Sequence, residues 1–451
     1  MSFRTHLRRL GALSVAVLAI GAATTAAATR TVRMADQVTR VKVAGIDLVA
    51  YPTAVKDVVT IVGAFPAGDA FAPLNGAAVP TLTGMMLDRG TTKEDKFVIA
   101  RQLEEVGASI AFGVETQTVS VRAHCLRKDL PLVIRLIAEQ LRTPAFAAAE
   151  LDKARQQFIG SLRNSVESTG FRAGDTFSRS VYPEGHPNRH PSIEDLIAAA
   201  QRATLDDLKS FHEKYYGPAH LTLVVVGDLD VKRLKSDVRA AFAGWTGGSD
   251  VRHPERPAAP DVARTEIVSL AGKTSVSVIL GRGTGLRYRD PDALALRVGT
   301  AILGSGFTGR LMSSVRDKEG LTYGIGAGLS NDTFTDGTWS INATFAPQLL
   351  DKGIASTRRE LTRWWTDGVT AQELADRKQN VIGTYQVSLA TTGGVANALL
   401  AAIQRGYGVS WLDEYPTAIN ALTLEQVNRA IRAHIDPTKL VLVEAGTLPS
   451  S

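Results

Sequence analysis

The sequence contains a single cysteine, Cys125, and this scarcity excludes any disulfide framework within the chain. Cys125 belongs to an alternating run that starts at Val119, which indicates a strand and favours a buried small side chain over a nucleophile. A large excess of one charge is also lacking, since 51 Lys and Arg stand against 45 Asp and Glu. Three of the arginines lie in an amino-terminal segment that we expect to be removed. The remaining excess is too small to favour a nucleic-acid partner.

Long apolar runs are scarce, and the clearest one lies at the amino terminus. Residues 1–28 combine a basic start, an apolar run from Leu10 to Ile20 and small residues that end at Ala28. This is the layout of a secretory signal peptide, although an uncleaved anchor is the alternative. The run is short for a permanent transmembrane helix, and no later stretch is long and apolar enough to span a membrane. We therefore expect a cleaved signal peptide and a periplasmic or otherwise exported protein.

Motifs of several enzyme classes are missing: H-E-x-x-H, G-x-S-x-G, the P-loop and C-x-x-C do not occur. Gly304–Gly309 has the dinucleotide-binding spacing, but the pattern before it predicts a helix where that motif needs a strand. His186 and His190 are each followed by proline, so we expect them in a loop and not on one helical face. A zinc site built from these two histidines is the less favoured alternative.

The chain contains one unit twice, because two pairs of segments match each other in the same order. Residues 148–170 align with residues 371–393, and residues 204–229 align with residues 423–448. The shared residues of the first pair are Ala148/Ala371, Glu150/Glu373, Leu151/Leu374, Gln156/Gln379, Ile159/Ile382, Gly160/Gly383, Ser165/Ser388, Thr169/Thr392 and Gly170/Gly393. The second pair shares Thr204/Thr423, Pro218/Pro437, Leu221/Leu440, Leu223/Leu442, Val224/Val443 and Gly227/Gly446. Each copy therefore ends with a helix, a proline-containing turn and a strand.

A segment rich in Gly, Pro and charge, residues 248–262, separates the copies and reads as a linker. We expect a signal peptide over 1–28, an N-terminal domain over 38–247 and a C-terminal domain over 263–451. Runs near residues 58–62 and 276–280 indicate strands, and residues 321–330 and 337–345 indicate a hairpin. Strands grouped apart from long helices predict an α+β fold of two homologous domains, each a mainly antiparallel sheet packed against helices.

One segment of the second copy combines a cation, a phenol and alternating glycines. A short helix is expected to end near Arg316, and the strand that follows carries Tyr323. Gly324, Gly326 and Gly328 then alternate, so one strand face bears no side chain. Such a face lets another backbone approach closely. It fits either a tightly packed helix or a wall that binds peptide.

These residues resemble the pitrilysin/insulinase-type zinc peptidases, or inverzincins, which include the mitochondrial processing peptidase subunits. The run from Gly309 to Tyr323 is similar to the family's carboxy-domain signature, in which an Arg and a Tyr seven residues later contact the substrate. The resemblance thus assigns substrate contact to Arg316 and Tyr323, beside the bare glycine strand. Val224–Asp228 and Gly185–Pro187 are similar to the family as well. The likeness covers essentially the whole chain after residue 28.

The family's zinc motif is His-x-x-Glu-His followed by Met-Leu-x-x-Gly-Thr. In this chain the trailing residues are kept, and they place Thr81 and Met85 at the two histidine positions and Gly84 at the glutamate position. A hydroxyl, a thioether and a glycine cannot hold Zn²⁺ or take a proton from its water.

The family's third zinc ligand, a Glu on a later helix, has no clear counterpart. The interior of that helix offers Gln156, Gln157 and a serine, while its acids Glu150 and Asp152 lie in the first turn, where they favour the helix dipole. Every metal position is therefore lost or doubtful, and we expect no metal and no cofactor in this chain.

The resemblance implies a non-catalytic, substrate-binding subunit of an exported heteromeric insulinase-type zinc metallopeptidase. Such a subunit pairs with a homologous zinc-bearing chain and supplies Arg316 and Tyr323 to its site for peptide hydrolysis. A non-enzymatic peptide-binding or scaffolding protein of the cell envelope fits the same residues. A third interpretation is an independent peptidase with displaced ligands such as His186 and His190.

Overall fold

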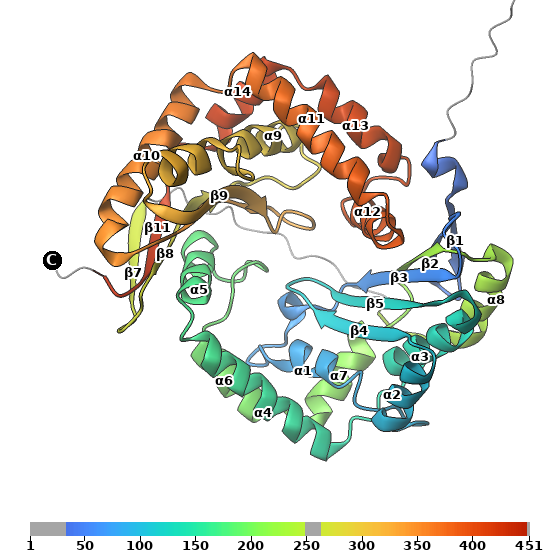
Figure 1. Ribbon diagram of the computed structural model, residues 1–451. Helices are drawn as coiled ribbons and strands as arrows, with labels where there is room; N and C mark the ends of the chain where they lie inside the picture. The colour runs from blue at the N-terminus through green and yellow to red at the C-terminus, as the bar shows by residue number, and fades with distance from the viewer. Residues whose placement is uncertain (1–32, 249–262, 449–451) are drawn as a thin grey trace, which may run out of the picture. The chain divides into compact units, whose positions relative to one another are not determined.

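The computed structural model describes residues 33–248 and 263–448. The expected signal peptide over 1–28 lies outside these residues, as does the expected linker apart from Gly248. The limits of the expected domains stay a prediction. The α+β class is confirmed, because the described residues contain two sheets, each covered by helices (Figure 1).

The first sheet has six strands in the order β1-β2-β6-β3-β5-β4. Only β2 and β6 are parallel, and the other neighbours are antiparallel. The strands are β1 (Thr39–Val43), β2 (Ile46–Pro52), β3 (Val58–Phe65), β4 (Ser109–Val114), β5 (Val119–Leu126) and β6 (Thr222–Gly227). The strand expected around Cys125 is present as β5, and the thiol is buried.

The second sheet repeats this topology with five strands in the order β7-β11-β8-β10-β9. Here β7 and β11 form the parallel pair, as β2 and β6 do in the first sheet. The strands are β7 (Arg264–Ser269), β8 (Val276–Gly283), β9 (Thr322–Ser330), β10 (Thr338–Phe345) and β11 (Val441–Gly446). The repeated order and directions confirm the duplication that the sequence predicts.

Fourteen α-helices accompany the sheets within the described residues. Those of the first copy are α1 (Val79–Met85), α2 (Lys96–Glu105), α3 (Leu130–Arg142), α4 (Ala148–Ser165), α5 (Thr169–Val181), α6 (Ile193–Arg202), α7 (Leu205–Tyr215) and α8 (Val231–Ala241). Those of the second copy are α9 (Ala293–Gly304), α10 (Leu350–Asp367), α11 (Ala371–Ser388), α12 (Thr392–Gln404), α13 (Trp411–Ala421) and α14 (Leu424–His434). Short turns of 3₁₀-helix are η1 (Met34–Gln37), η2 (Asp69–Phe71), η3 (Arg127–Asp129) and η5 (Pro347–Leu349), and η4 (Met312–Lys318) is a π-helix.

Residues shared by the two copies carry out the same local task in each. Thr204 and Thr423 both form a capping box, with Asp207 and Gln426, that starts the helix before the last strand of the copy. Gly227 and Gly446 end the last strand with φ of 146° and 152°, a conformation that L side chains rarely adopt. A Cβ at Gly227 would also lie 2.1 Å from the carbonyl oxygen of Val58. The structural requirement explains why these identities persist in both copies.

Each copy contributes one helix that packs on the sheet of the other copy. The outer face of the first sheet, which includes Val62 and Val224, packs against Val395 and Leu399 of α12. In return α5 packs Phe177 on the second sheet, where the buried partners include Ile279 and Val443. The sequence alignment makes α5 and α12 equivalent, so each copy covers the other's sheet with the same helix. Each fully buried Val or Leu contributes about 1.5–3 kcal/mol, so this packing joins the two copies firmly.

Within the described residues, none of the helices taken singly has the length and apolar character needed to cross a bilayer. The consecutive helices α11 and α12 meet those criteria only as a pair, with a bend of 115° between them.

Candidate functional site

Helix α1 carries the positions of the lost zinc motif. Pro80 lies in the first turn of the helix, and the hydroxyl of Thr81 donates a hydrogen bond of 2.8 Å to the carboxylate of Asp69. Asp69 is the first residue of the short helix η2. The first histidine position therefore holds a hydroxyl that is already committed to a neighbouring acid.

The position of the general-base glutamate holds a glycine, and a neighbouring side chain occupies the space that a larger residue would need. Gly84 is buried, and a Cβ placed on it would lie 2.2 Å from Cγ2 of Val114, at the end of β4. Because Val114 is β-branched and stiff, it cannot simply swing aside. A glutamate at residue 84 would have to displace it.

The other residues that could ligate a metal accept hydrogen bonds from arginine and lysine side chains. Arg89 donates to the carbonyl oxygen of Met85 at 2.9 Å, to Glu150 at 3.2 Å and to Gln157 at 2.7 Å. Hydrogen bonds from Lys153 and then Lys96, followed by the one from Arg89, lower the pKa of Glu150 to about 2. Across the part of the chain that the structure describes, no three His, Cys, Asp or Glu side chains are grouped so that they could hold a metal ion. The residues present do not fit zinc.

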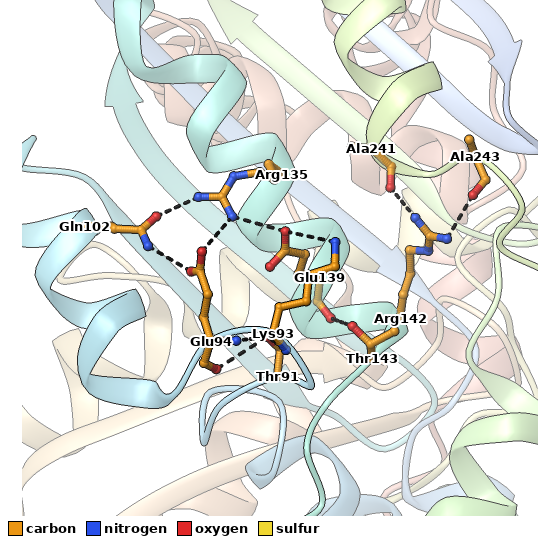
Figure 2. Close-up of polar contacts among 10 residues, drawn as sticks. All are labelled: Thr91, Lys93, Glu94, Gln102, Arg135, Glu139, Arg142, Thr143, Ala241 and Ala243. Atoms are coloured by element: carbon orange, nitrogen blue, oxygen red, sulfur yellow. Dashed lines mark hydrogen bonds and ion pairs between the residues drawn. The ribbon is translucent and has the colours of Figure 1, made fainter.

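The retained half of the motif has a structural role. Met86 and Leu87 are fully buried in the core of the first copy. Gly90 then takes φ of 101°, and Thr91 accepts a hydrogen bond from the backbone N–H of Glu94. Figure 2 shows how Glu94, in turn, is held by Arg135 of α3. Folding thus gives these residues of the motif a role without any metal chemistry.

Arg316 and Tyr323 lie side by side, together with an aromatic residue that sequence reasoning missed. The guanidinium carbon of Arg316 lies 5.3 Å from the ring centre of Tyr323 and 5.2 Å from that of Phe307. Both rings face solvent, with Tyr323 88 % and Phe307 73 % exposed. Large aromatic side chains are usually buried, so a solvent-exposed pair around one cation marks a surface suited to binding.

The segment that positions Arg316 differs from the expected short helix. It is a π-helix over Met312–Lys318 that extends past Arg316, and its wider turn is closed by bonds such as the one from Glu319 N–H to the carbonyl oxygen of Ser314. Buried Met312 and Val315 hold its inner side. Single π-helical turns often occur at functional sites, where they re-aim side chains.

The glycine strand is β9, which forms the edge of the second sheet. A Cβ added at Gly324 or Gly328 would meet no atom within 4 Å, whereas one at Gly326 would lie 3.1 Å from the carbonyl oxygen of Gly304. Helix α9 therefore approaches the strand at its middle glycine and leaves the other two open. Tyr323 lies at an irregularity in the β9–β10 register.

His186 is in the expected loop, but its ring nitrogens are engaged. Nδ1 accepts a hydrogen bond of 3.1 Å from the backbone N–H of Asn188, so Nε2 carries the proton and donates to Asp336 at 2.9 Å. The ring is fully buried and stacks on Tyr182. His190 is exposed nearby. The two histidines therefore do not form a pair of free metal ligands.

The loop with dinucleotide-binding spacing follows helix α9, as predicted, and not a strand. The residue of this loop that belongs to the candidate site is Phe307. Its ring lies beside Arg316 because the fold brings this loop against the π-helix. Asp69 was missed for a similar reason, because its bond to Thr81 joins two separate elements, the short helix η2 and helix α1. No local pattern marks either residue.

Comparison with known proteins accounts for this combination of features. The model of the insulinase family, peptidase family M16, matches residues 49–173, and the model of the M16 inactive domain matches residues 202–381. The chain belongs to the insulinase (M16) peptidase family. Its zinc-motif positions hold Thr81, Gly84 and Met85, so it is a non-catalytic, peptidase-like member.

Similar proteins are named either as zinc proteases or as inactive, non-peptidase homologues. An uncharacterized zinc protease of Streptomyces coelicolor is 25 % identical over 70 % of this chain and 69 % of its own. The non-peptidase homolog YmxG of Helicobacter pylori is 22 % identical over 83 % of this chain and 85 % of its own. The crystal structure of a peptidase M16 inactive domain from Pseudomonas fluorescens has a TM-score of 0.84 at 25 % identity, covering 92 % of this chain and 98 % of that one.

Proposed function

We propose that this chain is the non-catalytic, substrate-binding subunit of an exported, heteromeric insulinase-type zinc peptidase. The observation that supports this role most directly is the contact between Arg316 and Tyr323 in a chain whose own zinc positions are occupied by other contacts. A homologous partner supplies the zinc, and the residues 1–28 direct the chain to the periplasm or another exported location.

Arg316 and Tyr323 supply hydrogen-bond donors for the reaction. When a zinc-bound hydroxide in the partner attacks a peptide carbonyl, negative charge develops on the carbonyl oxygen. A guanidinium and a phenol held at that point stabilise the charge, and they do so best when they are already ordered. The ring of Phe307 on the other side of Arg316 supports that order.

The edge of β9 supplies a surface for the peptide backbone. An edge strand has unpaired backbone N–H and C=O groups, and an extended peptide can pair with them as an added strand. Gly324 and Gly328 add no side chain that would keep a peptide away. Together with Gly326 they form the substrate wall next to Arg316 and Tyr323.

Reconstitution with a zinc-bearing homologous chain tests the proposal. We expect peptide hydrolysis only in the mixture, and Arg316→Ala or Tyr323→Phe lowers kcat/KM by the equivalent of about 2.7–4 kcal/mol, the usual loss for one oxyanion donor. Val387→Ala, an exposed substitution on α11, is the matched control and leaves turnover unchanged. Full turnover with both donor variants would refute the donor role.

A peptide-binding or scaffolding protein of the cell envelope is the second candidate. The open glycines of β9 favour it equally, since they bind peptide without any catalytic partner. Co-purification from the envelope fraction separates the two functions. A stoichiometric zinc-bearing homologue supports the peptidase subunit, and its absence with retained peptide binding supports the scaffold.

A further inference from the structure

A cavity of about 670 Å³ opens beside the position of the lost zinc motif. Its walls come from α1, α4, α5 and α6 and from the loop before α6, all within the first copy. Thr81, at the first lost histidine position, is part of the lining. The volume is typical of pockets that bind small molecules or single side chains.

Much of the lining is apolar. Phe158 and Leu162 come from α4, Phe171 from α5, and Ile193 and Leu196 from α6. Phe171 remains 40 % exposed, which is unusual for an aromatic side chain at such a position. The cavity therefore offers a surface for an apolar body that would lose water contact on entering.

Most charged groups of the lining already have an ion-pair or hydrogen-bond partner. Arg179 forms an ion pair of 3.0 Å with Asp175, and Arg189 donates to backbone carbonyl oxygens, including that of Tyr182 at 2.7 Å. The hydroxyl of Ser192 donates to Asp195 at 2.6 Å. Four carboxylates and two guanidinium groups line the cavity, so its charge balance is negative with the histidines neutral.

Asp69 differs from the other acids of the lining because its one side-chain bond comes from Thr81, at the first lost histidine position. Oδ1 accepts the bond from Thr81, and among the residues that the structure describes no Lys, Arg or His forms an ion pair with Asp69. Burial raises its pKa to about 6, and the nearby charge of Glu115 adds to the rise. A carboxylate in such surroundings is stabilised by a cation that brings its own hydrogen-bond donors.

We infer that this cavity binds a primary ammonium group carried on an apolar stem, with the ammonium at Asp69 and the stem against Phe158 and Leu162. The proposed cation site thus lies next to the lost zinc motif, beside Thr81. A lysine side chain and a peptide amino terminus next to an apolar residue both have this chemistry. The inference concerns the chain alone and needs no partner.

Calorimetry on the full chain with two matched probes tests the site. We expect 2-phenylethylamine to bind about tenfold more tightly than 2-phenylethanol, because a hydrogen bond to a charged group is worth that difference. Asp69→Asn keeps an acceptor for Thr81 and reduces amine affinity about tenfold, without changing that of the alcohol. Equal affinity for the two probes, or full amine affinity in Asp69→Asn, would overturn the inference.

Two further variants test separately whether binding depends on another carboxylate of the cavity and on the cavity's free volume. Glu184→Gln removes an exposed carboxylate at the same cavity and is expected to change amine affinity less than twofold, because that acid remains hydrated. Leu196→Trp fills the cavity from a partly exposed position and abolishes binding of both probes. Circular dichroism shows that each variant is folded. Amine binding that survives Leu196→Trp would place the ligand elsewhere and refute the site.

Capped peptides then distinguish the two sources of the ammonium. A blocked peptide with one lysine, compared with its norleucine counterpart, reports on a side chain. A peptide with a free amino-terminal phenylalanine, compared with its acetylated form, reports on a chain end. We expect the lysine peptide, the peptide with a free amino terminus, or both to bind the wild-type chain and to lose affinity in Asp69→Asn. If neither peptide binds, the ammonium does not come from a peptide, and a peptide ligand is contradicted.

Discussion

The hydroxyl of Thr60, on β3, lies 2.8 Å from the hydroxyl of Thr392, at the first residue of α12. The duplicated position repeats the contact in the opposite direction, since Thr169 at the start of α5 lies 2.8 Å from Ser277 on β8. Thr169 and Thr392 are among the identities shared by the copies. Each of these helices is therefore fastened to the other copy's sheet by one hydroxyl pair at its first residue.

Removal of a hydroxyl from the first pair destabilises the fold. Thr60 is buried and also contacts Nδ1 of His124 at 3.1 Å, so Thr60→Val leaves two polar groups without their partner. We expect a loss of about 1–3 kcal/mol in the free energy of unfolding, measured by denaturant titration. Thr392→Val in the same background should cost much less than it does alone. Simple additivity of the two substitutions would contradict the coupling.

Substitution of Gly84 tests whether Val114 fills the general-base position. Gly84→Ala is expected to cost about 1–3 kcal/mol, and Val114→Ala in the same chain should recover part of the loss. Gly160→Ala is the control, because Gly160 lies in α4 with open space around it and alanine stabilises a helix by about 0.5–1 kcal/mol. Equal effects at both glycines would show that the contact with Val114 is not decisive.

The stability of the chain should depend on pH through Asp69. Its folded-state pKa of about 6 lies above its ordinary value, so the folded state binds the proton more tightly than the unfolded state. The free energy of unfolding therefore falls as pH rises from about 4 to 6, by at most about 3 kcal/mol. Asp69→Asn removes this part of the profile and is more stable than wild type at pH 7. Superimposable profiles would contradict the assignment.

Phe307 should support Arg316 in the assembled enzyme. A cation–π contact at an exposed site contributes about 0.5–1 kcal/mol, so Phe307→Leu lowers kcat/KM of the reconstituted peptidase about two- to fivefold. The loss is smaller than that for Arg316→Ala, because leucine leaves the donor in place. Phe307→Tyr keeps the ring and restores turnover. A leucine variant as active as wild type would remove Phe307 from the site.

Local sequence patterns predict much of the fold. The alternation in β10, where Trp339, Ile341 and Phe345 are buried, specifies one face of the strand before any contact is known. Capping residues such as Thr204 and Thr423 mark where helices begin. These features depend on neighbours a few residues apart, so periodicity and cap chemistry are sufficient to find them.

The candidate site is only partly visible in this way. Thr81, Gly84 and Met85 can be placed by the resemblance to the family's zinc motif, and Arg316 and Tyr323 by the resemblance to its carboxy-domain signature. Phe307 could not be placed, because its contact with Arg316 depends on how a loop after α9 meets a π-helical turn. The wider turn was also missed, since i to i+5 bonds leave no distinct pattern of apolar residues.

The sequence alone determined the duplication, the α+β class and the loss of the zinc-motif residues, because each is written in side-chain identity and in short periodic patterns. The tertiary structure decided that α5 and α12 each cover the other copy's sheet, that Val114 occupies the space beside Gly84, and that Asp69 lines a cavity together with apolar side chains of α4, α5 and α6. These contacts join segments that are distant along the chain. Their geometry is set by the packing of whole layers and not by any local preference.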